Sequence, residues 1–457
     1  MQTALPSGRA PQSADRKTVR RQILTLALPV VAEQILTTLT QIVDMMMVGH
    51  LGPAAIAAVG LSHQPLFLSM AIFMGIGAGT TALVARYTGA GDAATVESVT
   101  RQSFWMGLAA AIAVALVYYG FAPAIVAGMG AEAEVLPLGI DFLRWSALGF
   151  VAMQWSQVMS GALRGRGDTR TPLRIGVIIN IANVILGYSL IYGHFGLPAL
   201  GVVGSALGTT IARSIGALIL LSHLLSSSHP VRLHLPTLFQ LDLSMMARVL
   251  RIGLPAAGER VLQSLGMISF VRIIAGLGTV SVAAHQLAVN AESISYMPAI
   301  GLATAGTALV GQRLGAKDPE GANAVIAETV RITIGVMIVM SLIFLFLGRP
   351  YLSLYTSDTE VIALGALVLA IGAAAQVPMG ITFALAGALR GAGDTLPMMI
   401  VTALGVWVVR LSITAGLIHL AGLGLAAAWI SMTFDWSFRL LFALRRIRSG
   451  RWREVAM

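Results

Sequence analysis

Long apolar stretches separated by short polar segments run through almost the whole sequence. Each stretch can form a helix of about 20 residues, the length that crosses ~30 Å of hydrocarbon. The alternation over about ten residues that is typical of membrane β-barrel strands does not occur. The pattern therefore predicts an all-α integral membrane protein with twelve transmembrane helices. The predicted spans are 23–48, 54–84, 101–121, 137–160, 171–193, 200–222, 249–275, 280–310, 323–347, 361–387, 397–419 and 423–442.

The sequence repeats itself at one offset. Pro29 and Pro255 lie 255 − 29 = 226 residues apart, and Gly-Ala-Leu-Arg-Gly-x-Gly-Asp-Thr recurs at that offset in 161–169 and 387–395. Each half holds six spans, an even number, so both halves enter the membrane from the same side. This predicts two pseudo-twofold-related six-helix bundles around a central cleft. The predicted units are a cytoplasmic segment 1–22, a first bundle 23–222, a linker 223–248, a second bundle 249–442 and a basic tail 443–457.

Charge sets the orientation. Charged residues make up 11% of the chain, against roughly 25% in soluble domains. The net charge of +10 comes mainly from arginines in alternate interhelical segments and in the tail, the distribution found in cytoplasmic loops. We therefore expect a multi-pass protein of the bacterial inner (plasma) membrane with both termini in the cytoplasm and no nucleic-acid partner. The chain has no cysteine, which excludes disulfides and thiolate metal sites.

Two motifs suggest a family. The segment 43–52 (Val-Asp-Met-Met-Met-Val-Gly-His-Leu-Gly), followed by Ala-Ala-Val-Gly at 57–60, and the loop motif at 161–169 and 387–395 resemble signatures of the multidrug and toxic compound extrusion family. The resemblance covers about residues 20–445. It implies a V-shaped pair of bundles that exports amphipathic, often cationic, drugs in exchange for protons or sodium ions. It also implies a transporter without enzymatic activity or cofactor, in contact with the lipid bilayer and functional as a monomer.

Two carboxylates fall within the first span, where a charge costs about 2.5–3.5 kcal/mol. Glu33 and Asp44 are eleven residues apart, about three helical turns, so they share a face with Thr37 and Gln41. Asn180 and Asn183 in the fifth predicted span offer partners at similar depth. Asp44 resembles the coupling carboxylate of the family, either as a proton carrier or, with Asn183 and backbone carbonyls, as a ligand of Na⁺. The alternative is an Asp44 that is hydrogen-bonded only for packing.

Other polar residues in the spans are candidates for the substrate cleft. The repeat-equivalent Glu33 and Glu259 either face each other and attract cationic substrate or form ion pairs with Arg248, Arg251 or Arg260. Glu292 has Leu66 at the equivalent position of the first half, which favours a substrate-binding task over an ion pair with Arg272 or Arg410. The remaining candidates, which fit interhelical hydrogen bonds equally well, are Gln34, His63, Gln64, Gln263 and Asn290.

Two further expectations concern the tenth span and the two repeated loops. One branch of the family that the chain resembles carries an acid in the tenth span; here that span has none, so the resemblance does not imply a second cation site in the second bundle. In the two repeated loops, Arg164 and Arg390 are expected to pair with Asp168 and Asp394 within a tight turn.

Three other functions fit the sequence less well. A lipid-linked saccharide flippase of the same superfamily would need several cleft arginines and additional spans. An integral-membrane prenyl or glycosyl transferase would need an Asp-rich metal motif, and a channel would need a re-entrant filter segment. The sequence has neither of these elements.

Overall fold

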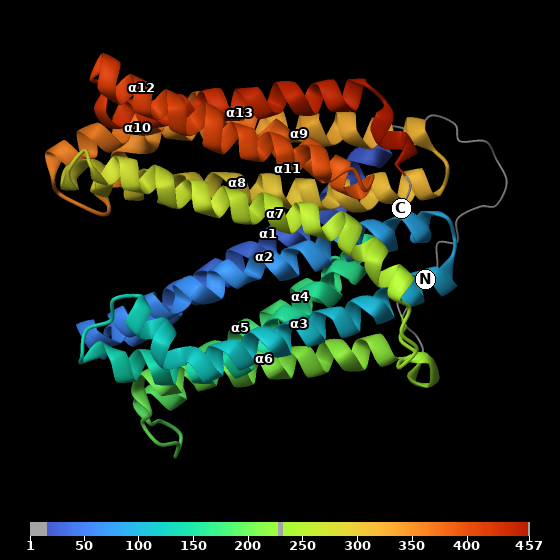
Figure 1. Ribbon diagram of the computed structural model, residues 1–457, viewed down its shortest axis with the longest axis horizontal. Coiled ribbons are helices and arrows are strands. Elements are labelled where there is room, and N and C mark those ends of the chain that lie inside the picture. The colour runs from blue at the N-terminus through green and yellow to red at the C-terminus, as the bar shows by residue number, and fades with distance from the viewer. Residues whose placement is uncertain (1–15, 227–231, 456–457) are drawn as a thin grey trace.

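The computed structural model describes residues 16–226 and 232–455, and its regular structure there is helical throughout (Figure 1). Parts of the predicted N-terminal segment (1–15), linker (227–231) and tail (456–457) lie outside the described residues. The first bundle contains α1 (Arg16–Gly49), α2 (Pro53–Gly89), α3 (Ala93–Gly128), α4 (Val135–Arg166), α5 (Arg170–Tyr192) and α6 (Gly201–Leu225). The second contains α7 (Leu243–Ala275), α8 (Thr279–Gly315), α9 (Pro319–Ser353), α10 (Thr359–Gly391), the continuous set α11 (Leu396–Ala403), η2 (Leu404–Arg410) and α12 (Leu411–Ala421), and α13 (Gly424–Arg448). Two short 3₁₀ turns, η1 (Leu235–Thr237) and η3 (Arg451–Glu454), complete the list.

The fold class is confirmed: twelve helical spans form two six-helix bundles. Within the described residues, ten spans are long and apolar enough to cross a membrane. The other two, α7 and α13, carry charges such as Glu259 and Asp435 in their central turns. The helices extend past the predicted spans, and α7 begins at Leu243, inside the segment expected to be a linker.

Aspartate caps fix several helix starts. The Asp92 carboxylate accepts a hydrogen bond from the backbone N–H of Thr95 (3.0 Å), and the repeat-equivalent Asp318 accepts one from Gly321 (2.8 Å). Such caps satisfy backbone donors that the first helical turn leaves without partners. The Thr95 side chain and backbone hydrogen bonds also hold the pKa of Asp92 below its usual value.

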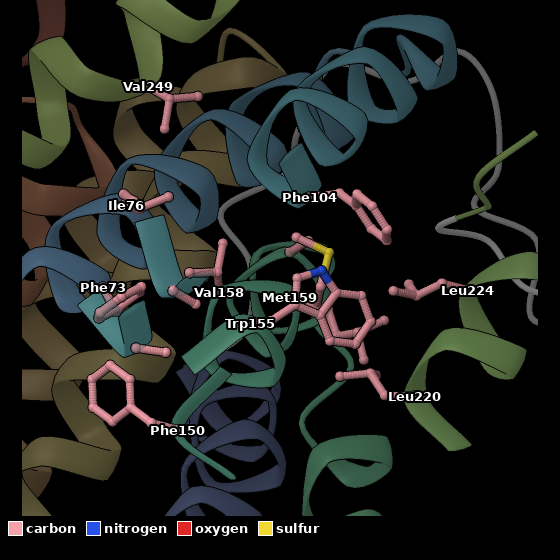
Figure 2. Close-up of a cluster of buried hydrophobic side chains, with 14 of the residues drawn as sticks. Phe73, Ile76, Phe104, Phe150, Trp155, Val158, Met159, Leu220, Leu224 and Val249 are labelled. Atoms are coloured by element: carbon pink, nitrogen blue, oxygen red, sulfur yellow. The ribbon is translucent and has the colours of Figure 1, made fainter. Parts of the chain in front are cut away.

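Both α1 and α7 start against the bundle opposite to their own. Ile23 and Leu26 of α1 are buried in a cluster with Leu302 and other second-bundle residues. Val249 of α7 belongs to the core cluster of the first bundle with Ile76, and Figure 2 shows these two side chains on neighbouring helices. The two bundles therefore interlock at the beginnings of their first helices.

The bundles meet at one end of the molecule, which we call the terminal end because α1 begins and α13 ends there. At the opposite, far end they diverge (Figure 1). At the contact, a Cβ on Gly75 of α2 would lie 2.6 Å from the carbonyl oxygen of Gly253 of α7. Gly89 similarly faces the backbone of Gln312, and its repeat equivalent Gly315 faces that of Arg86. Backbone touches backbone at these glycines, so they close the terminal end.

This close approach predicts that Gly75→Ala destabilises the protein. The added methyl group meets a carbonyl oxygen and Ala257 Cβ at 2.8 Å, and overpacking of this kind costs about 1–3 kcal/mol. Gly60→Ala, on the same helix with no atom within 4 Å of the new Cβ, is the matched control. Thermal unfolding of both purified variants tests the prediction; equal midpoints would show that the glycine contact is not tight.

Candidate functional site

The outer half of α1 carries the predicted polar stripe. Thr37 and Gln41 are exposed and lie on the same side of the helix as Asp44, as their spacing requires. Ile35 and Ile42 are also exposed, at 45% and 52%, but on the opposite side. One exposed face of α1 is therefore polar and the other is apolar, which suits a helix between a polar interior and lipid.

Asp44 lies where α1 packs against α5 and α6. Asn183 Nδ2 donates a hydrogen bond to Asp44 Oδ2 at 3.2 Å and also lies 3.4 Å from Thr209 Oγ1. Asn183 is 5% exposed, and its Oδ1 is buried without a hydrogen-bond partner. Gly187, one turn further along α5, leaves room at the carboxylate: a Cβ there would lie 4.0 Å from Asp44 Oδ1. Asp44, Asn183 and Thr209 thus bring carboxylate, amide and hydroxyl oxygens together.

The charge of Asp44 has no direct counter-charge. Arg213, one turn after Thr209 on α6, interacts with it electrostatically. Among residues 16–226 and 232–455, however, no lysine or arginine nitrogen lies within 4.0 Å of its oxygens. A carboxylate in this state can accept a proton. It can equally bind a hard cation, because such ions take oxygen ligands and Asn183 Oδ1 is unused.

Glu33 is engaged by a residue that the sequence did not indicate. Arg164 Nη2 donates to both carboxylate oxygens of Glu33, at 2.9 and 3.0 Å, and joins α1 to the end of α4. Of the two alternatives for Glu33, the ion pair is the one observed, but its partner is Arg164 and not Arg248, Arg251 or Arg260. The pairing expected inside the repeated loops is wrong as well, since Arg164 binds Glu33 and Asp394 pairs with Arg446 of α13 at 2.6 Å.

Glu259, the repeat equivalent of Glu33, also turns toward its own bundle. It accepts a hydrogen bond from Thr402 Oγ1 of α11 at 3.2 Å. The neighbouring Arg260 instead spans the two bundles, with its guanidinium 5.4 Å from the ring centre of Phe67 on α2. The two glutamates are thus directed to α4 and α11, while the contact between the bundles uses Arg260.

The other cleft candidates differ in exposure. His63 lies with its ring centre 5.7 Å from that of Phe142. Exposed candidates are Gln34, His63, Gln64 and Asn290, whereas Gln263 and Asn180 are half-buried and Glu292 is 7% exposed. Glu292 therefore does not line an open surface in this state.

Comparison with known proteins decides the family. The sequence model of the MatE family matches residues 29–189 and 255–416, two copies separated by 255 − 29 = 226 residues. A relative from Thermotoga maritima, a probable multidrug resistance protein NorM, is 31% identical over 443 residues and covers 96% of this chain and 94% of its own. The chain belongs to the multidrug and toxic compound extrusion family. The multidrug resistance protein PmpM of Pseudomonas aeruginosa is 30% identical over 86% of this chain and 83% of its own.

Solved structures of MATE transporters share the fold. A mutant of VcmN from Vibrio cholerae superimposes with a TM-score of 0.88 at 20% identity, covering 96% of this chain and 99% of its own. A transporter of the MOP superfamily from Pyrococcus furiosus gives 0.87 at 23% identity, with 98% and 100% covered. At these identities the likeness shows the architecture of a multi-pass MATE protein.

The second bundle of this MATE protein holds a buried ion cluster that sequence reasoning missed. Asp435 of α13 is fully buried, and Arg410 Nη2 lies 2.7 Å from its Oδ2 while Arg439 Nε lies 2.6 Å from its Oδ1. Both arginines are also buried, at 6% and 2% exposure. The signal that could have found the cluster is the coincidence of an acid with two arginines in adjacent apolar spans.

The counterpart of the Asp44 site is absent from the second bundle. The residue at 44 + 226 = 270 is Phe270, whose ring centre lies 5.5 Å from the Arg410 guanidinium. Asp435, one of the acids of this bundle, is on the last helix and forms ion pairs with two arginines. The second bundle therefore contains a closed ion cluster where the first has an accessible carboxylate.

Glu292 lies near this cluster without joining it. The alternative of an ion pair with Arg272 or Arg410 is not observed among the described residues, where Arg410 is held by Asp435. Its Oε1 is buried without a hydrogen-bond partner. On the next turn, Ser295 Oγ donates to Gln376 Oε1 of α10 at 2.8 Å.

Asp435 and Asp44 should respond differently when each carboxylate is neutralised. Asp435→Asn leaves two buried guanidiniums without their carboxylate, and breaking a buried ion pair costs about 3–5 kcal/mol. Asp44→Asn removes no direct ion pair, so its thermal-unfolding midpoint should stay close to that of the unmodified protein. Thermal unfolding in detergent measures both variants. A midpoint that falls as far for Asp44→Asn as for Asp435→Asn would contradict this distinction.

Proposed function

We propose that the protein is a secondary active exporter of amphipathic, often cationic, organic compounds, and that proton or Na⁺ entry drives it by alternating access. The observation that carries the proposal is the state of Asp44. It is a carboxylate at membrane depth with an amide donor, an unused amide oxygen and no ion pair within the described chain. A group that costs this much in hydrocarbon is suited to binding an exchangeable cation.

The arrangement of the bundles supports alternating access. The terminal end is closed by backbone contacts between the bundles, and the far end diverges (Figure 1). With both termini in the cytoplasm, this is the outward-open state. Cation binding at Asp44 would change the packing of α1 against α5 and α6. For coupling to exist, cation and drug must each bind the two states with different affinity.

The substrate class rests on two supports. Relatives from Thermotoga maritima and Pseudomonas aeruginosa bear the name multidrug resistance protein. In this chain, the ring of Phe67 on α2 is 55% exposed and already lies 5.4 Å from the guanidinium of Arg260, so an aromatic surface that accepts a cation is present. We further propose that the protein acts as a monomer in the inner membrane, since both bundles belong to one chain.

Asp44→Asn should abolish transport while the protein still folds. We expect gradient-driven uptake of a fluorescent cationic drug into proteoliposomes to fall by about tenfold or more, because the two states lose their difference in cation affinity. Imposing pH and sodium gradients separately identifies the driving ion. In cells, the variant should lose drug resistance at unchanged expression.

The matched control is Asp141→Asn, which neutralises an exposed acid on α4 that forms no ion pair among the described residues. It should transport at the rate of the unmodified protein. Full uptake and resistance by Asp44→Asn would refute the assignment of Asp44, whereas loss of uptake by both variants would point to a general effect of charge.

The orientation can be tested with introduced thiols, because the chain has no cysteine. Phe195→Cys, in the α5–α6 loop at the far end, should react in intact cells with a membrane-impermeant maleimide. Ser449→Cys, exposed after α13 at the terminal end, should react only after permeabilisation. The reverse labelling pattern would show that the termini face outward.

A further inference from the structure

A surface groove lies at the terminal end between the start of α1 and the start of α5. It has a volume of about 490 Å³. Its rim carries four exposed basic residues, namely Lys17, Arg20, Arg21 and Arg170. Its apolar wall includes Leu24 and Leu28, the latter 62% exposed. Positive charge and apolar surface therefore meet in one hollow.

The order of these residues along α1 matches the layers of a membrane. With 34 residues, α1 is about 51 Å long, well above the ~30 Å of a hydrocarbon core. Its first turns, from Lys17 to Arg21, therefore reach the level of the lipid headgroups. Leu24 and Leu28 follow one and two turns deeper, at the level where acyl chains begin.

The repeat shows that the fold does not require this charge. At an offset of 226, the four basic positions correspond to Leu243, Met246, Ala247 and Leu396 on α7 and α11. Leu243 and Leu396 are 76% and 52% exposed, so these equivalent positions present apolar side chains, while Arg251 stands where Thr25 lines the groove of the first half. Orientation in the membrane needs positive loops but does not require four charges to gather around one groove.

We propose that this groove binds an anionic phospholipid. The phosphate of the headgroup would accept charge-assisted hydrogen bonds from the arginines and the lysine, and one acyl chain would lie along Leu24 and Leu28. The apolar wall below the charged rim favours a lipid over free phosphate, which would use the rim alone. The choice of an anionic lipid follows from the basic rim.

The position of the groove gives such a lipid a structural effect. The first turns of α1 pack on the second bundle, whereas Arg170 belongs to α5 of the first bundle. A headgroup held by Arg20, Arg21 and Arg170 would therefore bridge the two bundles at their closed end. It would stabilise the state in which this end is shut.

The test is native mass spectrometry of the full chain, released from micelles that contain equal amounts of phosphatidylglycerol and phosphatidylcholine. The unmodified protein should retain phosphatidylglycerol with at least about tenfold preference, given the number of basic contacts. Arg20→Gln/Arg21→Gln/Arg170→Gln should lose this preference. The matched control is Arg448→Gln/Arg451→Gln/Arg453→Gln, which removes the same charge from exposed tail positions at the same end.

Two further arms make the outcome decisive. Leu243→Lys/Met246→Arg/Leu396→Arg should create a second basic lipid site at the equivalent position and raise the number of retained phosphatidylglycerol molecules by one. In a second arm, millimolar inorganic phosphate should not displace the lipid. Unchanged lipid preference in the groove variant, equal loss in the tail variant, or displacement of the lipid by phosphate would overturn the proposal.

Discussion

A carboxylate inside a membrane must be given a counter-charge, a proton or a metal ion, because hydrocarbon solvates it poorly. Asp435 and Asp44 meet that constraint in two contrasting ways. In the second bundle, Asp435 is held by Arg410 and Arg439 and is fully buried. In the first, Asp44 receives one hydrogen bond from Asn183 and only a longer-range interaction with Arg213. Under the proposed function, Asp44, which has no direct counter-charge, is the carboxylate that binds the exchangeable cation.

The duplicated architecture determines which parts of the protein a cation at Asp44 would affect under the proposed function. Both α1 and α7 cross from one bundle to the other, so a change in packing on the outer half of α1 affects a helix whose beginning is fixed in the second bundle. The glycine contacts are repeated in both halves, as Gly89 and Gly315 show, and they favour a discrete closed arrangement. The halves differ in their charges. Phe270 replaces the acid at the position equivalent to Asp44. Under the proposed function, the two similar bundles would therefore be driven by a cation site in the first bundle alone.

The spans and the repeat could be predicted because hydrophobic length and a constant offset are properties of the linear chain. The predicted neighbourhood of Asp44 and Asn183 followed from shared depth in the membrane. The partner of Glu33 could not be predicted, because Arg164 is 131 residues away and only folding brings the two side chains together. Thr209 has no feature in the sequence that separates it from other threonines in the spans. The start of α7 at Leu243 depends on the local cap made by Asp242, which hydropathy does not register.

The central claim is that cation binding at Asp44 lowers the affinity of the protein for drug. Equilibrium binding to the purified protein tests this claim most directly. The affinity for a fluorescent cationic drug would be measured as proton and sodium concentrations are varied independently. Because linkage is reciprocal, the coupling cation must weaken drug binding by the factor by which drug weakens cation binding. The account predicts that this dependence is present in the unmodified protein and disappears in Asp44→Asn. The same dependence on the cation in both proteins would contradict it.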